Sequence, residues 1–88
     1  MKEKDLEKIF KALANRRRIA IIRFLKKQKE ASVGEIAEEI ELSFKATSKH
    51  LNILATADFL EKEQKSLQML YRLNADSLKF MHHLVAIL

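Results

Sequence analysis

Hydrophobic residues in the first third of the chain recur with the spacing of helices. Over residues 5–13, four apolar side chains stand at i, i+3, i+4 and i+7, which is the spacing of one helix face: Leu6, Ile9, Phe10 and Leu13. Asn15 can cap a second helix that runs through Lys27. The apolar arc of that helix is wide enough for a central core position, and it comprises Ile19, Ile21, Ile22, Phe24 and Leu25.

Two more helices, separated by a short turn, are predicted for the middle of the chain. Ser32 and Glu35 have the spacing of a capping box, and the short helix they open has one apolar face: Val33, Ile36, Ala37 and Ile40. Ser43 can cap a fourth helix that ends at about Ala57, with Thr47, Leu51 and Leu54 spaced to face inward. Asp58 tolerates the left-handed conformation that ends such a helix.

The pattern then changes to the two-residue alternation of strands. Strands over residues 60–63 and 67–73 would flank a polar tip, Gln64-Lys65-Ser66, as in a β-hairpin. The second strand is expected to turn one apolar face inward, formed by Leu67, Met69, Tyr71 and Leu73. Asn74 can cap a last helix over residues 75–88.

These elements predict a mainly α fold with a small β-hairpin (α+β), in the order α-α-α-α-β-β-α, with room for a very short strand before the third helix. Two helices around a tight turn, followed by a hairpin, are typical of a winged helix-turn-helix. The length of 88 residues fits one domain over residues 1–88.

Composition narrows the function. The chain has no cysteine, no proline and one glycine, which excludes disulfides, thiolate metal sites, cysteine nucleophiles and glycine-rich phosphate-binding loops. No nucleophile, base and orienting group stand together, so we expect neither an enzyme nor a cofactor. No apolar run approaches the roughly 20 residues of a membrane span, so we expect no membrane partner and a cytoplasmic protein.

The charge distribution favours an anionic partner. The net charge is +5, divided into +8 over residues 1–29, −5 over residues 30–42 and +2 over the remainder. On the fourth helix, Lys45 and Lys49 can donate to DNA, Ser48 and Asn52 are short hydrogen-bonding groups, and His50 can donate to a phosphate. Further contacts are expected from Lys62 and Lys65 in the hairpin, and flanking ones from Lys2, Lys4 and Lys8.

The sequence carries IFKALAN at residues 9–15, SVGEIA at residues 32–37 and YRLN at residues 71–74, together with Arg18, Ile21, Ile22 and Leu25. Residues 42–54 also match L-S-x-x-x-x-S-x-H-L-x-x-L at every lettered position. With these segments the chain resembles the ArsR/SmtB-like winged helix-turn-helix repressors over nearly its whole length. The resemblance implies a homodimer joined through the first and last helices, with residues 44, 45, 48 and 49 directed at the major groove.

The terminal helices supply the expected dimer contacts, since exposed apolar side chains on them need cover. These are Leu6, Phe10, Leu78, Met81, Leu84, Val85 and Leu88.

Some positions depart from the family pattern. Phe44 stands where the family often has glutamine, which implies packing or an apolar contact to a thymine methyl, and packing is the expectation for a phenylalanine. Arg16 replaces a usual proline, Asp58 a usual glycine, and the wing tip at Lys65-Ser66 lacks glycine.

A metal site is not expected. Residues 31–36 lack the two cysteines of one family metal site. The other site would need Asp76, His82 and His83, but adjacent histidines point about 100° apart on a helix. Only His83 of one chain and Asp76 of a second could meet across a dimer.

Three arginines, Arg16, Arg17 and Arg18, begin the second helix, where positive charge opposes the helix dipole. A DNA phosphate or the acidic face of the third helix can compensate, so we expect at least one internal ion pair. That acidic face comprises Glu35, Glu38, Glu39 and Glu41. Arg18, at a recurrent arginine position of the family, is expected to be structural.

The sequence thus favours a sequence-specific, homodimeric transcriptional repressor that places residues 43–57 in the major groove of double-stranded DNA at an inverted-repeat operator. The alternative is a winged-helix protein-interaction module that uses the acidic third helix or the apolar last helix and binds no specific DNA. The effector stays open between an organic ligand, a partner protein and none.

Overall fold

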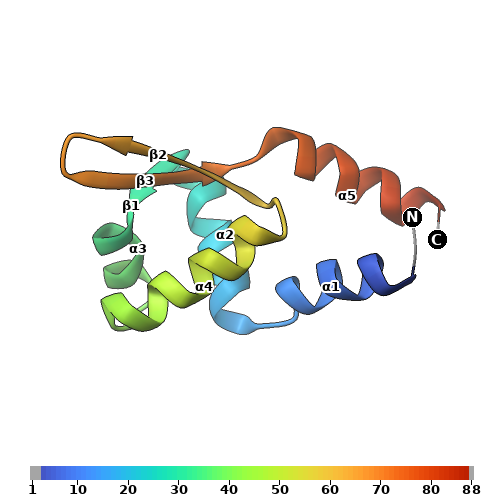
Figure 1. The fold of residues 1–88 in the computed structure, drawn as a ribbon, viewed down its shortest axis with the longest axis horizontal. Helices are drawn as coiled ribbons and strands as arrows, with labels where there is room; N and C mark the ends of the chain where they lie inside the picture. The colour runs from blue at the N-terminus through green and yellow to red at the C-terminus, as the bar shows by residue number, and fades with distance from the viewer. Residues whose placement is uncertain (1–2, 88) are drawn as a thin grey trace.

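The computed structural model describes residues 3–87, with side chains described for all of these except residues 78, 84, 85 and 87. The predicted order of helices is confirmed, and the short strand before the third helix is present (Figure 1). The elements are α1 (Glu3–Leu13), α2 (Arg16–Gln28), β1 (Glu30–Ser32), α3 (Val33–Glu39), α4 (Phe44–Thr56), β2 (Leu60–Lys65), β3 (Gln68–Leu73) and α5 (Ala75–Ile87).

Side-chain caps set the beginnings of the helices, as the sequence predicts. The Asn15 side chain accepts the backbone N–H groups of Arg17 and Arg18 at 2.9 and 3.2 Å, and Ser43 accepts that of Ala46 at 3.1 Å. The capping box of Ser32 and Glu35 is formed in both directions. These bonds satisfy N–H groups that have no partner inside a helix.

Three of the helices, α2, α3 and α4, are followed by a residue in the left-handed region, and none of these residues is glycine. After α2, α3 and α4 the positive φ angles are 76° at Lys29, 54° at Glu41 and 63° at Asp58. The stop predicted at Asp58 is confirmed. Each such residue costs roughly 1 kcal/mol relative to its preferred conformation, so packing of the helices on either side must hold these turns.

The core lies where α2, α3 and α4 meet. Its fully buried side chains are Ile21, Leu25, Ile36, Thr47, Leu51 and Leu54. The inward positions predicted for the fourth helix are therefore confirmed. Ile19 is a correction: its side chain is 42% exposed, so the apolar arc of α2 is wider than the surface that its neighbours cover.

The three strands form one antiparallel sheet in the order β1-β3-β2. β2 and β3 stay paired as far as Lys65 opposite Gln68, so the turn has two residues, Ser66 and Leu67. The predicted three-residue tip and the inward orientation of Leu67 are both wrong, because Leu67 lies in the turn with 98% of its surface exposed. The left-handed φ of 56° at Ser66 allows the tight turn, which suits the twist of the strands.

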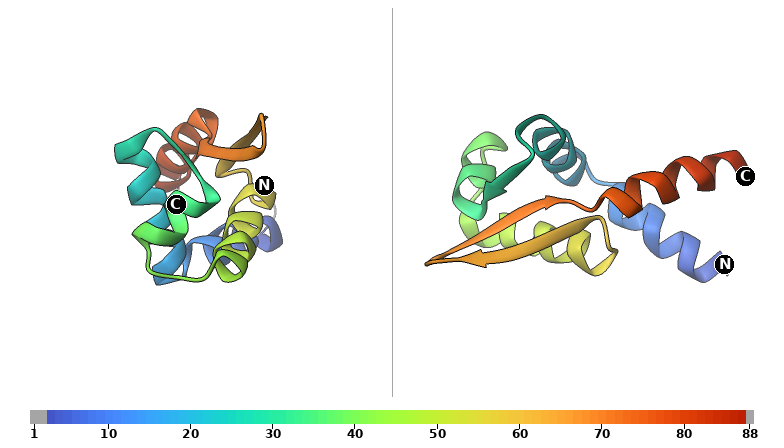
Figure 2. Two further views of the ribbon diagram at one scale, coloured as in Figure 1. Left: turned by 90° about the vertical axis from the view of Figure 1, so that its left-hand side faces the viewer. Right: turned by 90° about the horizontal axis from the view of Figure 1, so that it is seen from above.

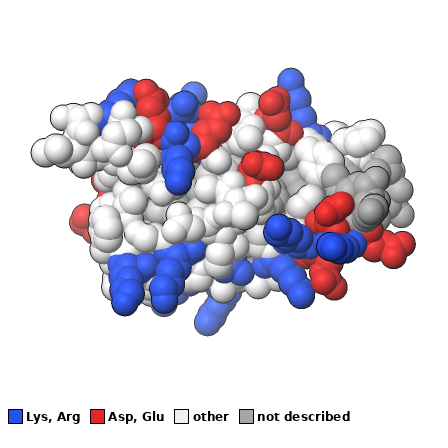
Figure 3. Space-filling view, in the orientation of Figure 1, with Lys and Arg blue, Asp and Glu red and all other residues white. Residues whose placement is uncertain are grey.

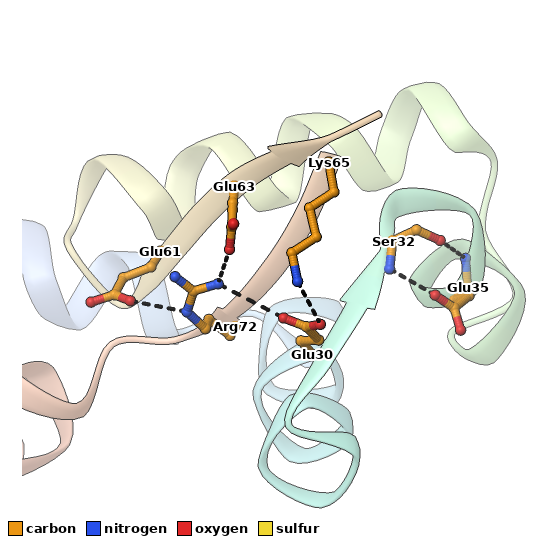
Figure 4. A network of polar contacts seen from close by, with 7 residues as sticks. All are labelled: Glu30, Ser32, Glu35, Glu61, Glu63, Lys65 and Arg72. Carbon is orange, nitrogen blue, oxygen red and sulfur yellow. Dashed lines mark hydrogen bonds and ion pairs between the residues drawn. The ribbon is translucent and has the colours of Figure 1, made fainter. Parts of the chain in front are cut away.

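An ion-pair network joins all three strands on one face of the sheet (Figure 4). Arg72 on β3 contacts Glu61 at 3.2 Å and Glu63 at 3.0 Å on β2, and Glu30 on β1 at 3.8 Å. Lys65 contacts the same Glu30 at 3.9 Å. The hydrogen bond to Glu63 raises the pKa of Arg72, as does the one to Glu61. The network links side chains of the three strands, and the backbone pairing of β1 with β3 holds the hairpin to β1.

The molecule is elongated, with principal extents of 40, 21 and 19 Å. The hairpin projects from one end as a slender arm, and α1 and α5 project from the other, where both ends of the chain lie (Figure 2). No helix among the described residues is long and apolar enough to cross a membrane.

One core position predicts a gain in stability. The Thr47 hydroxyl is buried and has no hydrogen-bond partner among the described residues. Thr47→Val keeps the shape and removes the unpaired oxygen, so we expect the free energy of unfolding to rise by about 1 kcal/mol in urea titrations. Thr56→Val, at an exposed position of the same helix, is the matched control and should change little. A loss of stability in Thr47→Val would show that the hydroxyl is satisfied in solution.

Candidate nucleic-acid interface

Helix α4 is held on one side and open on the other. Leu51 and Leu54 fix its inner side to the core, while Lys45, Lys49 and Asn52 are exposed at i, i+4 and i+7. This spacing places the three polar side chains along one face of the helix. Neither lysine makes an ion pair within residues 3–87. The face is therefore available to an anion such as the DNA backbone.

Two other predicted contacts on α4, Ser48 and His50, are half-buried. His50 Nδ1 lies 3.2 Å from Nη1 of Arg18 on α2. A guanidinium has only donors, so Nδ1 must accept, and the imidazole is neutral with its proton on Nε2. Burial lowers the pKa of His50 below its ordinary value of 6.5, and the positive charges of Arg18 and Arg17 lower it further. The Nε2–H group is the one that can donate to a phosphate.

The arginines at the start of α2 bind carbonyl groups at the ends of other helices. Arg17 donates to the carbonyl oxygens of Ile40 and Glu41 just after α3. Arg18 donates to those of Ala12 and Lys11 in the last turn of α1, at 2.6 and 3.2 Å. Carbonyls at a helix C-terminus carry partial negative charge, which compensates the unfavourable position of the arginines. The structural role expected for Arg18 is confirmed.

The ion pair predicted for these arginines is wrong. Within residues 3–87 the ion pairs involve other residues, and Arg16, Arg17 and Arg18 make none. Helix-end carbonyls take the place that the acidic face of α3 was expected to fill.

The His50 contact predicts a pH-dependent stability. In the unfolded chain His50 binds a proton near its ordinary pKa of 6.5. In the folded chain the pKa of His50 is lowered, so the proton binds only at a lower pH. The free energy of unfolding should therefore fall as the pH drops from 6.5 towards the lowered pKa, and should be fully restored above 6.5. His50→Gln cannot bind that proton and should flatten this part of the profile in melts between about pH 7.5 and 5.5. Equal slopes in the two proteins would contradict the assignment.

The β2–β3 hairpin, here called the wing, places its two lysines in different surroundings. Lys62 is exposed and pairs in register with Tyr71, on the side of the sheet that covers the core. Lys65 belongs to the opposite side, where its ammonium group contacts Glu30. That side also carries Glu61 and Glu63, so Lys65 stands among carboxylates. Of the two lysines, Lys62 is the one without an ion pair among the described residues.

Phe44 does not have the packing role that the sequence predicts. Its side chain is 63% exposed, so it does not serve mainly to pack against the body of the domain. It lines a groove of about 350 Å³ between the first turn of α4 and the wing, together with Leu67, Val33 and Met69. The sequence pattern does not identify Leu67 as a member of this surface. A hairpin with a two-residue turn at Ser66 and Leu67 would have placed Leu67 at the tip. No Asn-Gly or similar pair in the sequence marks that turn.

Basic side chains gather along one edge of the molecule. In Figure 3 lysine and arginine side chains follow the lower edge beneath α4, whereas the wing and the end of the molecule that carries α1 both mix the two signs. This agrees with the exposed Lys45 and Lys49 on α4. On α1 the exposed Lys4, Lys8 and Lys11 alternate with exposed carboxylates, and Lys11 pairs with Glu7 at 3.4 Å. Lys2 lies outside the described residues. A polyanion could lie along α4 without meeting the acidic face of the sheet.

The expected dimer contacts are described only in part. Phe10 is 40% exposed, Leu6 is half-buried, and Met81 is half-buried against the core. The side chains of Leu78, Leu84 and Val85, and the whole of Leu88, lie outside what the structure describes. Among the described residues, no group of three or more histidine, cysteine or acidic side chains could hold a metal ion, and Asp76, His82 and His83 are exposed.

Comparison with known proteins gives the same picture. Residues 15–62 match the family described as "Bacterial regulatory protein, arsR family". The chain is 34% identical over 77 residues to the transcriptional activator HlyU of Vibrio cholerae, covering 88% of this chain and 70% of that protein. The structure of reduced HlyU from V. cholerae has a TM-score of 0.77 at 32% identity, covering 93% of this chain and 85% of the other.

A second solved structure carries more detail in its description. It is the homodimeric winged helix-turn-helix DNA-binding domain of Mb0332 from Mycobacterium bovis, a possible ArsR-family regulator, with a TM-score of 0.80 and 26% identity. The match covers 96% of this chain and 77% of the Mb0332 domain. The matched family and HlyU are regulators, in agreement with the expectation of a regulator rather than an enzyme. The fold, the motif at residues 42–54 and these matches together show that the chain belongs to the arsR family of bacterial regulatory proteins.

Proposed function

We propose that this arsR-family regulator binds double-stranded DNA as a homodimer and places residues 43–57 of each protomer in the major groove of an inverted-repeat operator. The observation that carries the proposal is the open face of α4, where Lys45, Lys49 and Asn52 are exposed on a helix whose other face is fully buried. A helix held this rigidly can present side chains to base edges in a constant register. We also propose that residues 1–88 act as one domain in the cytoplasm.

Each predicted contact has a distinct proposed role. Lys45 and Lys49 bind phosphates or guanine edges, and Ser48 and Asn52 donate and accept at base edges. His50 donates to a phosphate through Nε2, and Lys62 and Lys65 reach the backbone from the wing. Phosphate contacts carry most of the affinity and base contacts most of the specificity. No effector or metal enters the proposal.

The test is fluorescence anisotropy with an operator selected from a random DNA pool by the protein, and a scrambled duplex of equal composition. We expect the operator to bind at least about a thousandfold more tightly, with affinity falling steeply as salt rises. Equal, negligible binding to both duplexes would overturn the proposal. It would favour the protein-interaction alternative, for which the exposed carboxylates of α3 are the available surface.

Dimer formation is proposed to use α1 and α5, which project together from the body of the domain (Figure 1). Mb0332, with the same fold, is described as homodimeric. We expect sedimentation of the chain at micromolar concentration to give a dimer, and Phe10→Glu to give a folded monomer, because a charge would have to be buried in the interface. Lys8→Glu, at an exposed position of α1, is the control. A monomeric wild type contradicts the prediction.

The direction of regulation is proposed to be repression. HlyU is named an activator, so the family does not fix the direction. A transcription assay with the selected operator placed over the promoter tests it: repression predicts that transcript falls as protein is added, and a rise would overturn that part of the proposal alone.

A further inference from the structure

The two most exposed large hydrophobic side chains of the described residues lie on the surface proposed to meet DNA. Phe44, in the first turn of α4, is 63% exposed, and Leu67, at the tip of the wing, is 98% exposed. A single exposed apolar residue is ordinary, but these two line one groove of about 350 Å³ with Val33 and Met69. Three polar residues, Ser32, Gln64 and Gln68, also line this groove, and an exposed apolar surface rimmed by polar residues is typical of an interaction site.

The neighbouring charges identify the partner. Lys45 follows Phe44 in sequence and Lys49 lies one turn further along the same exposed face, and neither has an ion-pair partner in the described part of the chain. A surface that combines unpaired cations with an exposed aromatic ring fits a polyanion that also offers apolar groups. DNA offers them in the major groove as the 5-methyl groups of thymine.

The tip of the wing has a shape and chemistry that suit the minor groove of DNA. Its turn has only two residues, and the side-chain amide of Gln64 donates to the Ser66 carbonyl at 3.1 Å, which braces it. The ammonium group of Lys65, two residues before Leu67 in the chain, contacts Glu30 at 3.9 Å. The two turn residues, Ser66 and Leu67, carry no charge, and the far end of the wing is white in Figure 3. A leucine on so narrow a turn can enter a minor groove about 6 Å wide.

We propose, building on the DNA-binding function above, that this protein reads its operator at two apolar points, with Phe44 contacting thymine methyl groups in the major groove and Leu67 packing in the adjacent minor groove. Lys45 and Lys49 then supply the attraction to phosphates, and the apolar pair adds to the discrimination that the polar base contacts of α4 provide. An operator with thymine at the positions that face the start of α4 is the preferred partner. The contribution of Leu67 does not depend on salt, since no counterion is released when an apolar side chain binds.

The Phe44 contact is tested by removing only the methyl group, through replacement of the half-site thymines by deoxyuridine in the selected operator. Wild type should bind the thymine operator roughly tenfold more tightly than the uracil one, counting two half-sites. Phe44→Ala should bind both duplexes equally, at about the affinity of wild type for the uracil operator. Phe44 is exposed, so the variant should keep its fold, which circular dichroism checks.

The Leu67 contact is tested by a salt series. Leu67→Ala should weaken binding roughly fivefold at every salt concentration and leave the slope of log K against log salt unchanged. Lys45→Ala, the contrasting variant, should reduce that slope by roughly two for a dimer. Wild type that prefers neither operator over scrambled DNA would refute the DNA-binding function itself. Wild-type binding that ignores the methyl groups, or a Leu67→Ala variant that binds like wild type, would refute the apolar readout while leaving that function intact.

Discussion

Replacement of both Lys45 and Lys49 by alanine is expected to weaken operator binding by about a hundredfold or more near 0.1 M salt. The two ammonium groups lie on the exposed face of α4 and have no ion-pair partner within residues 3–87, so phosphates would be their principal partners. A dimer loses four such contacts, and the slope of log K against log salt should fall by roughly three to four. Anisotropy titrations at several salt concentrations measure both quantities.

The matched control is Lys26→Ala with Lys27→Ala in the last turn of α2. It removes the same charge from exposed positions on another helix, and it should change the slope little. If the two double variants lose affinity equally, the effect belongs to overall charge rather than to α4. If the α4 variant binds like wild type, those lysines have no part in DNA binding.

Leu51→Ala is expected to lower the free energy of unfolding by about 2–5 kcal/mol. Leu51 is fully buried on the inner side of α4, between the exposed contacts of that helix and the core. A domain of this size has a total stability of roughly 4–13 kcal/mol, so the loss is a large fraction of what holds α4 in place. Urea unfolding followed by circular dichroism measures it, and DNA binding should weaken in parallel.

Ile53→Ala is the control for this substitution. It lies two residues further on the same helix and is 43% exposed, so it should cost about 1 kcal/mol or less. Equal losses from the two alanine variants would mean that α4 docks in another orientation. The face assigned to DNA would then have to be reassigned as well.

Local patterns in the sequence were enough to predict the helices and most of their boundaries. The caps at Asn15, Ser32 and Ser43 and the left-handed stop at Asp58 all depend on residues within a few positions of one another. Helical spacing also identified the buried face of α4, because one periodic stripe of apolar residues has only one way to be covered. The family motif at residues 42–54 lies within this well-predicted part.

Hairpin geometry could not be predicted in the same way. Alternation over residues 67–73 fits strands joined by a three-residue or a two-residue turn equally well, and only the pairing of Lys65 with Gln68 decides between them. That choice moved Leu67 from an expected inward position to the fully exposed tip. It also placed Lys65 beside Glu30, which is far away in the sequence.

The sequence by itself determined the fold class, the helix-turn-helix and the polar face of α4, since each follows from interactions between near neighbours in the chain. Only the tertiary structure decided what Arg17, Arg18 and Lys65 contact and which apolar side chains remain uncovered. The physical reason is that long polar side chains take whichever partner the folded chain brings within reach. Helix-end carbonyls and residues of distant strands become partners only when the elements have packed.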